Sequence, residues 1–349
     1  MQVINSRPNI SLANSSASFQ AVLQDIVDNI TIESNFGVTH THYQPLELTE
    51  ESVGRFQKLP QALQDKYLTL QLCNYLAGIY FTHSLQTILS ADQKTGNSTE
   101  PQLEENTTLA GVDVVFFERL HSNNNGQGYD DFGWQVIGEG EGNTLIVSKD
   151  ELTLHIKRDR HLSPETQSTA VGELVSIRLP RNRVDSRNYI AIGNAGSHER
   201  EDANSDQQNV GIYFNFNAEG AVRFMAGLTE KLNELSIPFS FKVPYNPWDY
   251  KRCDSGKLYF HQQDYQAVKS VLQPIYLANR DLFNSKYPFL TKILAPGIAL
   301  AEEPNLNSPE AESFSKNRCQ MIADGLIKSW KNGEQLKDSK MNQILQQFD

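Results

Sequence analysis

Several signatures of common protein classes are missing from this sequence of 349 residues. It has three cysteines, which is an odd number, and they stand far apart without any Cys-x-x-Cys pair. This spacing argues against a disulfide scaffold and against a zinc cluster, and it favours buried thiols in a reducing compartment. No apolar run is long enough for a transmembrane helix, and the polar N-terminus is unlike a signal peptide. We therefore expect a cytoplasmic protein with no membrane partner.

Motifs for metals, nucleotides and activated serines are also missing. The eight histidines form no His-x-x-x-His or His-Glu-x-x-His pattern, and the sequence has no Gly-x-Gly-x-x-Gly, no phosphate-binding loop and no Gly-x-Ser-x-Gly elbow. The net charge of −11 argues against nucleic acid as a partner, because binding a phosphate backbone requires a basic surface. We therefore expect no metal, no cofactor and no nucleic-acid partner.

The hydrophobic pattern changes near residue 111. Residues 18–94 have helical character: apolar residues from Phe19 to Ile30 follow one helix face, Thr49 caps a helix, and Pro60 opens another. The polar run that follows is typical of a connector. Beyond it come short β-type runs separated by Gly, Asn and Asp.

These patterns predict an α+β fold, in which a helical N-terminal segment precedes a mixed, largely antiparallel sheet with packed helices. We divide the chain into a helical segment (1–95), a linker (96–111), the α+β domain (112–335) and a polar tail (336–349). Within the domain, residues 211–243 have the pattern strand, helix, strand, and residues 257–261 alternate as a further strand.

Three residues on or between these strands suit a site that removes phosphate. Lys242 stands in an apolar strand, and burial would lower the pKa of its ammonium and make it a competent base. Arg252 has the planar fork that suits phosphate oxygens, and Asp254 could orient it. The hydroxyl of Tyr259 could bind phosphate or donate a proton. Each residue also fits a simpler role, as an exposed strand lysine, a surface arginine or a half-buried tyrosine.

The C-terminal region offers further cations. A helix is predicted over residues 313–332, with Ser313 as its cap and with Lys316 and Arg318 in its first turns. Cations there oppose the helix dipole, whose N-terminal end favours anions. We therefore expect an anion at this helix start, and we expect Arg252 and Arg318 to converge on one phosphate pocket. A solvated helix end is the alternative.

The run from Tyr213 to Arg318 resembles the HopA-type effector family. The matching blocks are Y-F-N (213–215), N-A-E-G-A-V (217–222), P-F-S-F-K (238–242), R-C-D (252–254), L-Y-F (258–260), L-A-P-G-I-A-L-A-E-E-P (294–304) and S-F-S-K-N-R (313–318). That family is named for a type III effector of plant pathogens. Its members in thioamitide and class V lanthipeptide clusters are identified as lyases that act beside a separate kinase-like protein.

This resemblance implies a phosphoserine or phosphothreonine lyase. The kinase-like partner would phosphorylate a precursor peptide, and the lyase would eliminate phosphate to leave dehydroalanine or dehydrobutyrine. The resemblance implies the following roles: catalytic for Lys242, Tyr259 and Asn215, and phosphate-binding for Arg252, Arg318, Lys316 and Tyr213.

One feature of the related phosphothreonine lyases is missing. Those enzymes carry Lys-x-His on the strand before the helix, and its histidine is the general acid, whereas this chain has Tyr213 and Asn215 there. Arginines could neutralise the leaving phosphate instead. The alternative function is a non-catalytic, effector-like module that binds a phosphopeptide or a protein partner.

Overall fold

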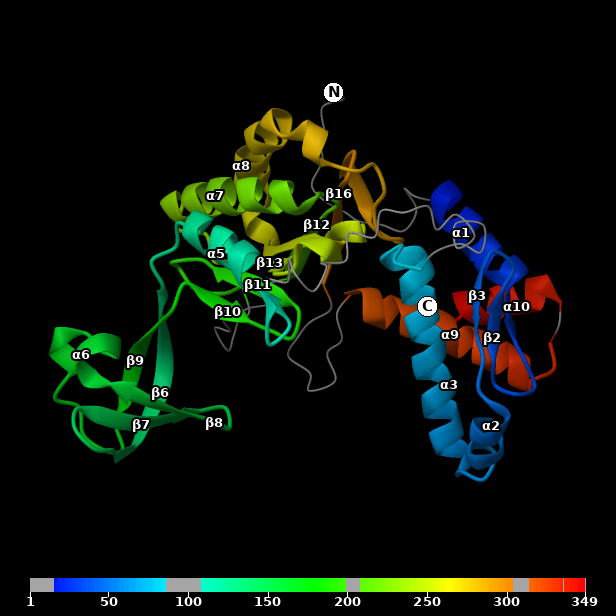
Figure 1. Cartoon of the computed structure of the whole chain (residues 1–349), viewed down its shortest axis with the longest axis horizontal. Helices are drawn as coiled ribbons and strands as arrows, with labels where there is room; N and C mark the ends of the chain where they lie inside the picture. The colour runs from blue at the N-terminus through cyan, green and yellow to red at the C-terminus, as the bar shows by residue number, and fades with distance from the viewer. Residues whose placement is uncertain (1–15, 86–107, 199–207, 304–313, 335, 349) are drawn as a thin grey trace.

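A seven-stranded antiparallel sheet forms the centre of the computed structural model (Figure 1), which describes residues 16–85, 108–198, 208–303, 314–334 and 336–348. Its strands, in sheet order, are β10 (Asn182–Val184), β11 (Asn188–Ile192), β13 (Phe239–Pro244), β14 (Gly256–His261), β12 (Asn209–Phe214), β16 (Ile298–Glu302) and β15 (Lys292–Ala295). The predicted α+β class is confirmed. The sheet is not mixed, since every pairing among these described strands is antiparallel.

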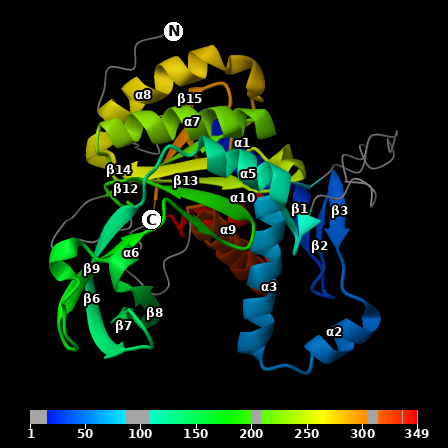
Figure 2. The same cartoon turned by 60° about the vertical axis from the view of Figure 1, so that its left-hand side comes forward.

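Helices cover both faces of this sheet, as Figure 2 shows. One face packs against α5 (Val114–Asn123), α7 (Ala218–Glu234) and α8 (Tyr265–Ala278). The opposite face packs against α3 (Gln61–Leu76) and α9 (Phe314–Lys331). Because side chains alternate along a strand, each central strand contributes to both layers.

The predicted strand–helix–strand pattern is present as β12, α7 and β13. Asn217 caps α7 by accepting a hydrogen bond from the backbone N–H of Gly220 at 2.9 Å. The apolar stripe of α7 is buried against the sheet. In the sheet, β14 lies between β13 and β12 and pairs with both. The three strands thus bring distant parts of the sequence onto one surface.

The N-terminal segment is helical only in part. As predicted, α1 (Ser16–Asn29) forms, Thr49 caps α2 (Glu50–Phe56), and α3 begins after Pro60. A π-helical turn, η2 (Ala77–Phe81), extends α3.

The expectation of helix fails over residues 30–46, which form β1 (Ile30–Ile32), β2 (Val38–His40) and β3 (Tyr43–Leu46). Two local features explain the strands. The β-branched residues around Thr31 favour extended backbone. In the turn, Asn35 Oδ1 accepts the N–H of Gly37, and Phe36 has a φ of 64°.

A separate four-stranded antiparallel sheet lies at the lower left of Figure 1. Its strands, in order, are β8 (Leu152–Lys157), β7 (Thr144–Lys149), β6 (Tyr129–Glu139) and β9 (Leu174–Leu179). It has a small apolar core of its own, which includes Trp134 and Val147. The chain from residue 112 to residue 335 therefore contains two sheets with separate cores.

Short elements complete the described chain. They are β4 (Thr108–Leu109), β5 (Val112–Asp113), α6 (Arg158–His161), η4 (Pro164–Thr166), η5 (Pro247–Lys251), η6 (Gln262–Asp264) and η7 (Arg280–Leu282). Most of the expected linker, residues 96–107, lies outside the described residues, and so does Ser313. None of the described helices is both long and apolar enough to cross a membrane. All three cysteines fall within the described residues, where they are buried thiols.

The end of the chain is not simply a polar tail. Residues 337–345 form α10 (Lys337–Leu345), which packs on α9 and α1. Ile344 is fully buried in the core that α9 shares with the N-terminal segment. At Gly325 of α9 an added Cβ would lie 2.5 Å from Ile344 Cα, so the two backbones touch there. Ile344 is thus the fully buried anchor of a largely polar helix, and Met341 and Phe348 pack against the same core.

Candidate functional site

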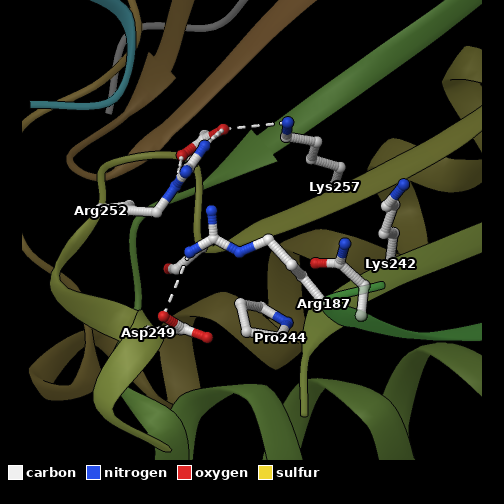
Figure 3. A pocket seen from close by; sticks show the side chains of 9 residues that line it. Arg187, Lys242, Pro244, Asp249, Arg252 and Lys257 are labelled. Carbon is white, nitrogen blue, oxygen red and sulfur yellow. Dashed lines mark hydrogen bonds and ion pairs between the residues drawn. The ribbon is translucent and has the colours of Figure 1, made fainter. Parts of the chain in front are cut away.

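A cavity of about 140 Å³ opens beside β13 and β14 and is lined largely by charged side chains (Figure 3). Its lining residues are Arg187, Asn188, Lys242, Pro244, Asp249, Arg252, Asp254, Ser255 and Lys257. Four of them are cationic and two are acidic. The lining is thus net positive in a chain whose net charge is −11. A local basic pocket of this kind attracts an anion.

Two lysines lie side by side at this cavity. Lys242 of β13 and Lys257 of β14 are directly opposed in the sheet register, and Tyr213 of β12 opposes Lys257 on the next strand. Residues opposed in this way have their side chains about 5 Å apart at Cβ. The ammonium of Lys257 also lies over the ring of Tyr213, 5.6 Å from its centroid. Two like charges therefore share a small area and require nearby carboxylates.

Asp254 supplies the carboxylate for Lys257. Its Oδ2 lies 2.9 Å from Lys257 Nζ, and its two oxygens accept two hydrogen bonds from the guanidinium of Arg252 at 2.8 and 2.9 Å. Burial alone would raise the pKa of Asp254, but attraction to Lys257 and Arg252 outweighs it and holds the pKa well below its usual range. Burial also acts to lower the pKa of Lys257, yet Asp254 raises it overall. The predicted pairing of Arg252 with Asp254 is confirmed.

Lys242 has a different partner. Its ammonium lies 2.5 Å from Asp185 Oδ2, and both side chains are about a third exposed, at 32% and 33%. Asp185 belongs to the turn between β10 and β11. The pKa of Asp185 is lowered; burial opposes this shift, and hydrogen bonds from Lys242 and from the backbone of Arg187 produce it. Lys242 is therefore paired at the edge of the cavity and not buried alone.

Tyr259 and Tyr213 lie next to this cavity, on the same face of the sheet. The hydroxyl of Tyr213 donates to Glu303 Oε1 at 2.6 Å and also bonds with the hydroxyl of Tyr259. Burial raises the pKa of both tyrosines. The ring of His198 stacks on Tyr259 at 5.2 Å, and burial lowers the pKa of His198 to about 3. The two tyrosines are thus neutral and fixed, and neither is among the residues that line the cavity.

Asn215 has a structural setting. Its side-chain amide donates to Lys286 O at 2.9 Å, and its Oδ1 accepts from Asn284 at 3.3 Å. Its backbone bonds with Gly297 and Asn284. These contacts fix the chain around residue 285, and Asn215 does not line the cavity.

The structure does not bring Arg318 and Lys316 into the cavity with Arg252. The guanidinium of Arg318 lies over the rings of Phe314 and Phe348, 5.6 and 5.8 Å from their centroids. Lys316 is exposed on the first turn of α9. Neither residue is among those that line the cavity.

The start of α9 does meet an anion, and the chain itself supplies it. Glu303 Oε2 accepts the backbone N–H of Phe314 at 3.1 Å. This contact fits the preference of helix N-termini for negative charge. The anion predicted at this helix start is therefore accounted for by the carboxylate of Glu303, the residue that follows β16.

Sequence reasoning missed Lys257 and Arg187. The alternation in residues 257–261 carried a usable signal, because Lys257 and Tyr259 must lie on the same face of a strand. Arg187 follows a turn whose Asp185 accepts its backbone N–H at 2.9 Å, and only the pairing of β11 with β13 places it near Lys242. No local pattern indicates that proximity.

The arrangement suits one small anionic group. A volume of about 140 Å³ is below the roughly 300–1,000 Å³ of typical small-molecule sites. Arginine forks and lysine ammonium groups are the side chains that recognise phosphate best. Among the described residues, no group of three or more His, Cys, Asp or Glu side chains is placed to hold a metal ion.

Comparison with known families gives a match over just under half of the chain, in the part that contains this cavity. Residues 179–349 match the HopA1 effector protein family. This part of the chain belongs to that family. The match confirms the resemblance to HopA-type effectors. It begins at the end of β9, so it covers the seven-stranded sheet, α9 and α10, and it leaves out the N-terminal segment and most of the four-stranded sheet.

Two solved effector structures have a weak similarity to most of this chain. One is the effector protein from Pseudomonas syringae pv. tomato strain DC3000, with 15% identity and a TM-score of 0.36 over 75% of this chain and 88% of that chain. The other is the effector protein from Pseudomonas syringae pv. syringae strain 61, with 11% identity and a TM-score of 0.39 over 82% of this chain and 93% of that chain. A search of curated protein sequences gave no match.

Proposed function

We propose that this HopA1-family protein is a metal-independent lyase that binds a phosphorylated peptide and eliminates phosphate from its phosphoserine or phosphothreonine. The product is dehydroalanine or dehydrobutyrine, and a separate kinase-like protein supplies the phosphorylated substrate. The observation that carries the proposal is the convergence of Arg187, Lys242, Arg252 and Lys257 on one small cavity.

The reaction requires a base and a cationic cradle. Lys242 acts as the base: once its ammonium has given up a proton, the amine removes the α-proton of the substrate residue, the electron pair forms the Cα=Cβ bond, and the Cβ–O bond breaks to release phosphate. Arg252 and Lys257 hold the leaving phosphate, and fixed charges of this kind usually contribute the largest part of the rate enhancement.

Lys242 suits the role of base better than Lys257 does. Asp254 is buried and holds Lys257 in its charged form. The partner of Lys242 is Asp185, which is about a third exposed, and the ammonium separates more readily from it. The two lysines thus have environments that assign them different roles.

Mass spectrometry tests this function directly. The protein is incubated with a phosphoserine peptide in the presence of EDTA, and the expected result is the loss of phosphoric acid from the peptide. Lys242→Ala and Lys242→Arg should both still bind the peptide and fail to convert it, because arginine keeps the charge without the basicity. Lys251→Ala, at an exposed position of η5 outside the cavity, is the matched control and should convert the peptide at the normal rate.

A second function has one observation in its favour. Each cation of the cavity already pairs with a carboxylate, including Arg187 with Asp249 at 3.3 Å. This arrangement fits a module that captures a phosphopeptide without changing it, as an effector would. Bound but unchanged peptide in the same experiment would support the module and would overturn the lyase.

A further inference from the structure

The turn that carries Arg252 and Asp254 is held from behind by the N-terminal segment. The backbone N–H of Cys253, between those two residues, donates to Thr82 O at 3.0 Å. The thiol of Cys253 donates to Phe81 O at 2.9 Å. Cys253 is only 2% exposed, so both bonds are shielded from water. The site turn is therefore fixed to the end of η2, which lies outside the family match.

The backbone around η2 is unusual. It is a π-helical turn, and His83, two residues after it, has a φ of 51° in the left-handed region. Such features cost conformational energy and occur frequently at functional sites. The carbonyl of Tyr80 in the same turn accepts the N–H of Phe289 at 3.1 Å. The π-turn thus presents successive carbonyl groups to two segments of the family domain.

The π-turn also bonds to the N-terminal elements α1 and β2, through the side chain of Tyr80. The hydroxyl of Tyr80 donates to Asp25 Oδ2 of α1 at 2.7 Å and lies 3.1 Å from His40 Nε2 of β2. Tyr80 is 7% exposed and His40 is 5% exposed. A continuous chain of contacts therefore runs from α1 and β2, through η2, to Cys253 and the turn beside the pocket; it is buried at His40, Tyr80 and Cys253, and its α1 end, Asp25, is 45% exposed.

We propose that this N-terminal anchor, formed by Asp25, His40 and η2, positions the Arg252–Asp254 turn and so sets the affinity of the pocket for phosphate. The Tyr80 hydroxyl and the Cys253 thiol are its positioning groups. The part of the proposal that concerns affinity rests on the proposed phosphate-binding function. The part that concerns mechanical coupling does not.

Two tyrosine variants of the full chain test the coupling. Tyr80→Phe removes the bonds to Asp25 and His40 and keeps the ring. Tyr75→Phe is the matched control. It also removes the hydrogen bond of one tyrosine hydroxyl, which Tyr75 of α3 donates to Gln44 O at 3.0 Å. Tyr75 lies outside η2, the turn whose end bonds to Cys253. Hydrogen exchange of the peptide that contains Cys253 is measured for both variants. We expect faster exchange in Tyr80→Phe and no change in Tyr75→Phe.

Binding of a phosphoserine peptide is the second readout. Tyr80→Phe should weaken it roughly fivefold or more, the usual size of coupling between sites, and Tyr75→Phe should leave it unchanged. Cys253→Ala should also weaken binding, and Cys253→Ser, which keeps a donor for Phe81 O, should restore most of it. This pair of variants tests the anchor even if Tyr80→Phe fails to fold.

Equal exchange at Cys253 in the two tyrosine variants would overturn the anchor, and so would equal peptide affinity in all four. If the wild-type protein binds no phosphopeptide, the proposed function fails, while the exchange experiment still decides whether η2 positions the turn.

Discussion

At the scale of single residues, Asp254 has the largest structural role in the pocket. It is 3% exposed in its side chain and serves two cations at once. Removing one member of a buried charged group leaves the others without compensation, which costs more than the group contributes as a whole. The carboxylate therefore determines both the stability of the turn and the direction in which Arg252 and Lys257 point.

We predict that Asp254→Asn lowers the free energy of unfolding by about 3–5 kcal/mol. Asp249→Asn is the matched control, because Asp249 also lines the pocket and pairs with an arginine. Its partner Arg187 is 57% exposed, so this loss should be at most about 1 kcal/mol. Urea unfolding at pH 7 measures both. A similar small loss in the two variants would mean that Asp254 is not the centre of a buried charge cluster.

The same carboxylate predicts a pH dependence. The folded-state pKa of Asp254 is lowered, so its contribution to stability is complete above the ordinary value of 3.8 and is lost as the pH falls below 3.8 towards the folded-state pKa. The difference in unfolding free energy between wild type and Asp254→Asn should therefore stay constant from neutral pH down to about pH 5 and shrink below about pH 4. A difference that grew on acidification would contradict the assigned direction of the shift.

At the scale of elements, the contact between α9 and α10 gives a sharp test. Gly325 of α9 meets the backbone of Ile344, whereas Gly54 of α2 has no atom within 4 Å of an added Cβ. In both helices alanine is favoured over glycine by about 1 kcal/mol. We predict that Gly54→Ala raises the unfolding free energy by up to about 1 kcal/mol, while Gly325→Ala lowers it by roughly 1–3 kcal/mol because the helices must separate. Thermal unfolding of the two variants compares them, and a stabilised Gly325→Ala protein would mean that α10 does not pack as described.

Elements with a regular period could be predicted from the sequence. The stripe of α7, the cap at Thr49 and the opening of α3 at Pro60 are local signals, and the structure has all three. The strands β1 to β3 were missed because their signal is only three or four residues long in each case. The helix α10 was missed because its burial depends mainly on Ile344, whose environment is set by α9.

The site could be predicted only where it is local. The pairing of Arg252 with Asp254 spans two positions and was predictable. The opposition of Lys242 and Lys257 depends on the strand order, in which β14 enters between β13 and β12. The position of Arg318 depends on the packing of α9 against Phe348 at the end of the chain. No spacing in the sequence encodes these long-range contacts.

At the scale of the whole molecule, the hydrophobic cores do not follow the domain boundaries that we predicted from the sequence. One core contains side chains of α1, α3, η2, α9 and α10. It also includes Tyr213 of β12 and Ala301 of β16, on the sheet face that α3 and α9 cover. The four-stranded sheet has its own core. The N-terminal segment and the family domain should therefore unfold as one unit, and the four-stranded sheet should respond separately.

Two core substitutions distinguish these units. Leu72→Ala, at a fully buried position of α3, should destabilise by about 2–5 kcal/mol and speed hydrogen exchange in both α3 and α9. Val147→Ala, at a fully buried position of β7, should speed exchange in residues 129–179 and leave β12 to β14 unchanged. Exchange that spread equally through both sheets after Val147→Ala would show one cooperative unit instead of two.

The pairing of every pocket cation with a carboxylate has a consequence for the proposed reaction. A phosphate that enters this cavity does not find bare positive charge; it displaces Asp185 and Asp249 and must share Arg252 and Lys257 with Asp254. Binding is then an exchange of counter-ions, whose net free energy is small. Affinity for free phosphate should be modest, and each carboxylate is ready to return as phosphate departs. Because these carboxylates compete with phosphate for the cations, they would lower the affinity for phosphate and, for the same reason, favour its release as a product.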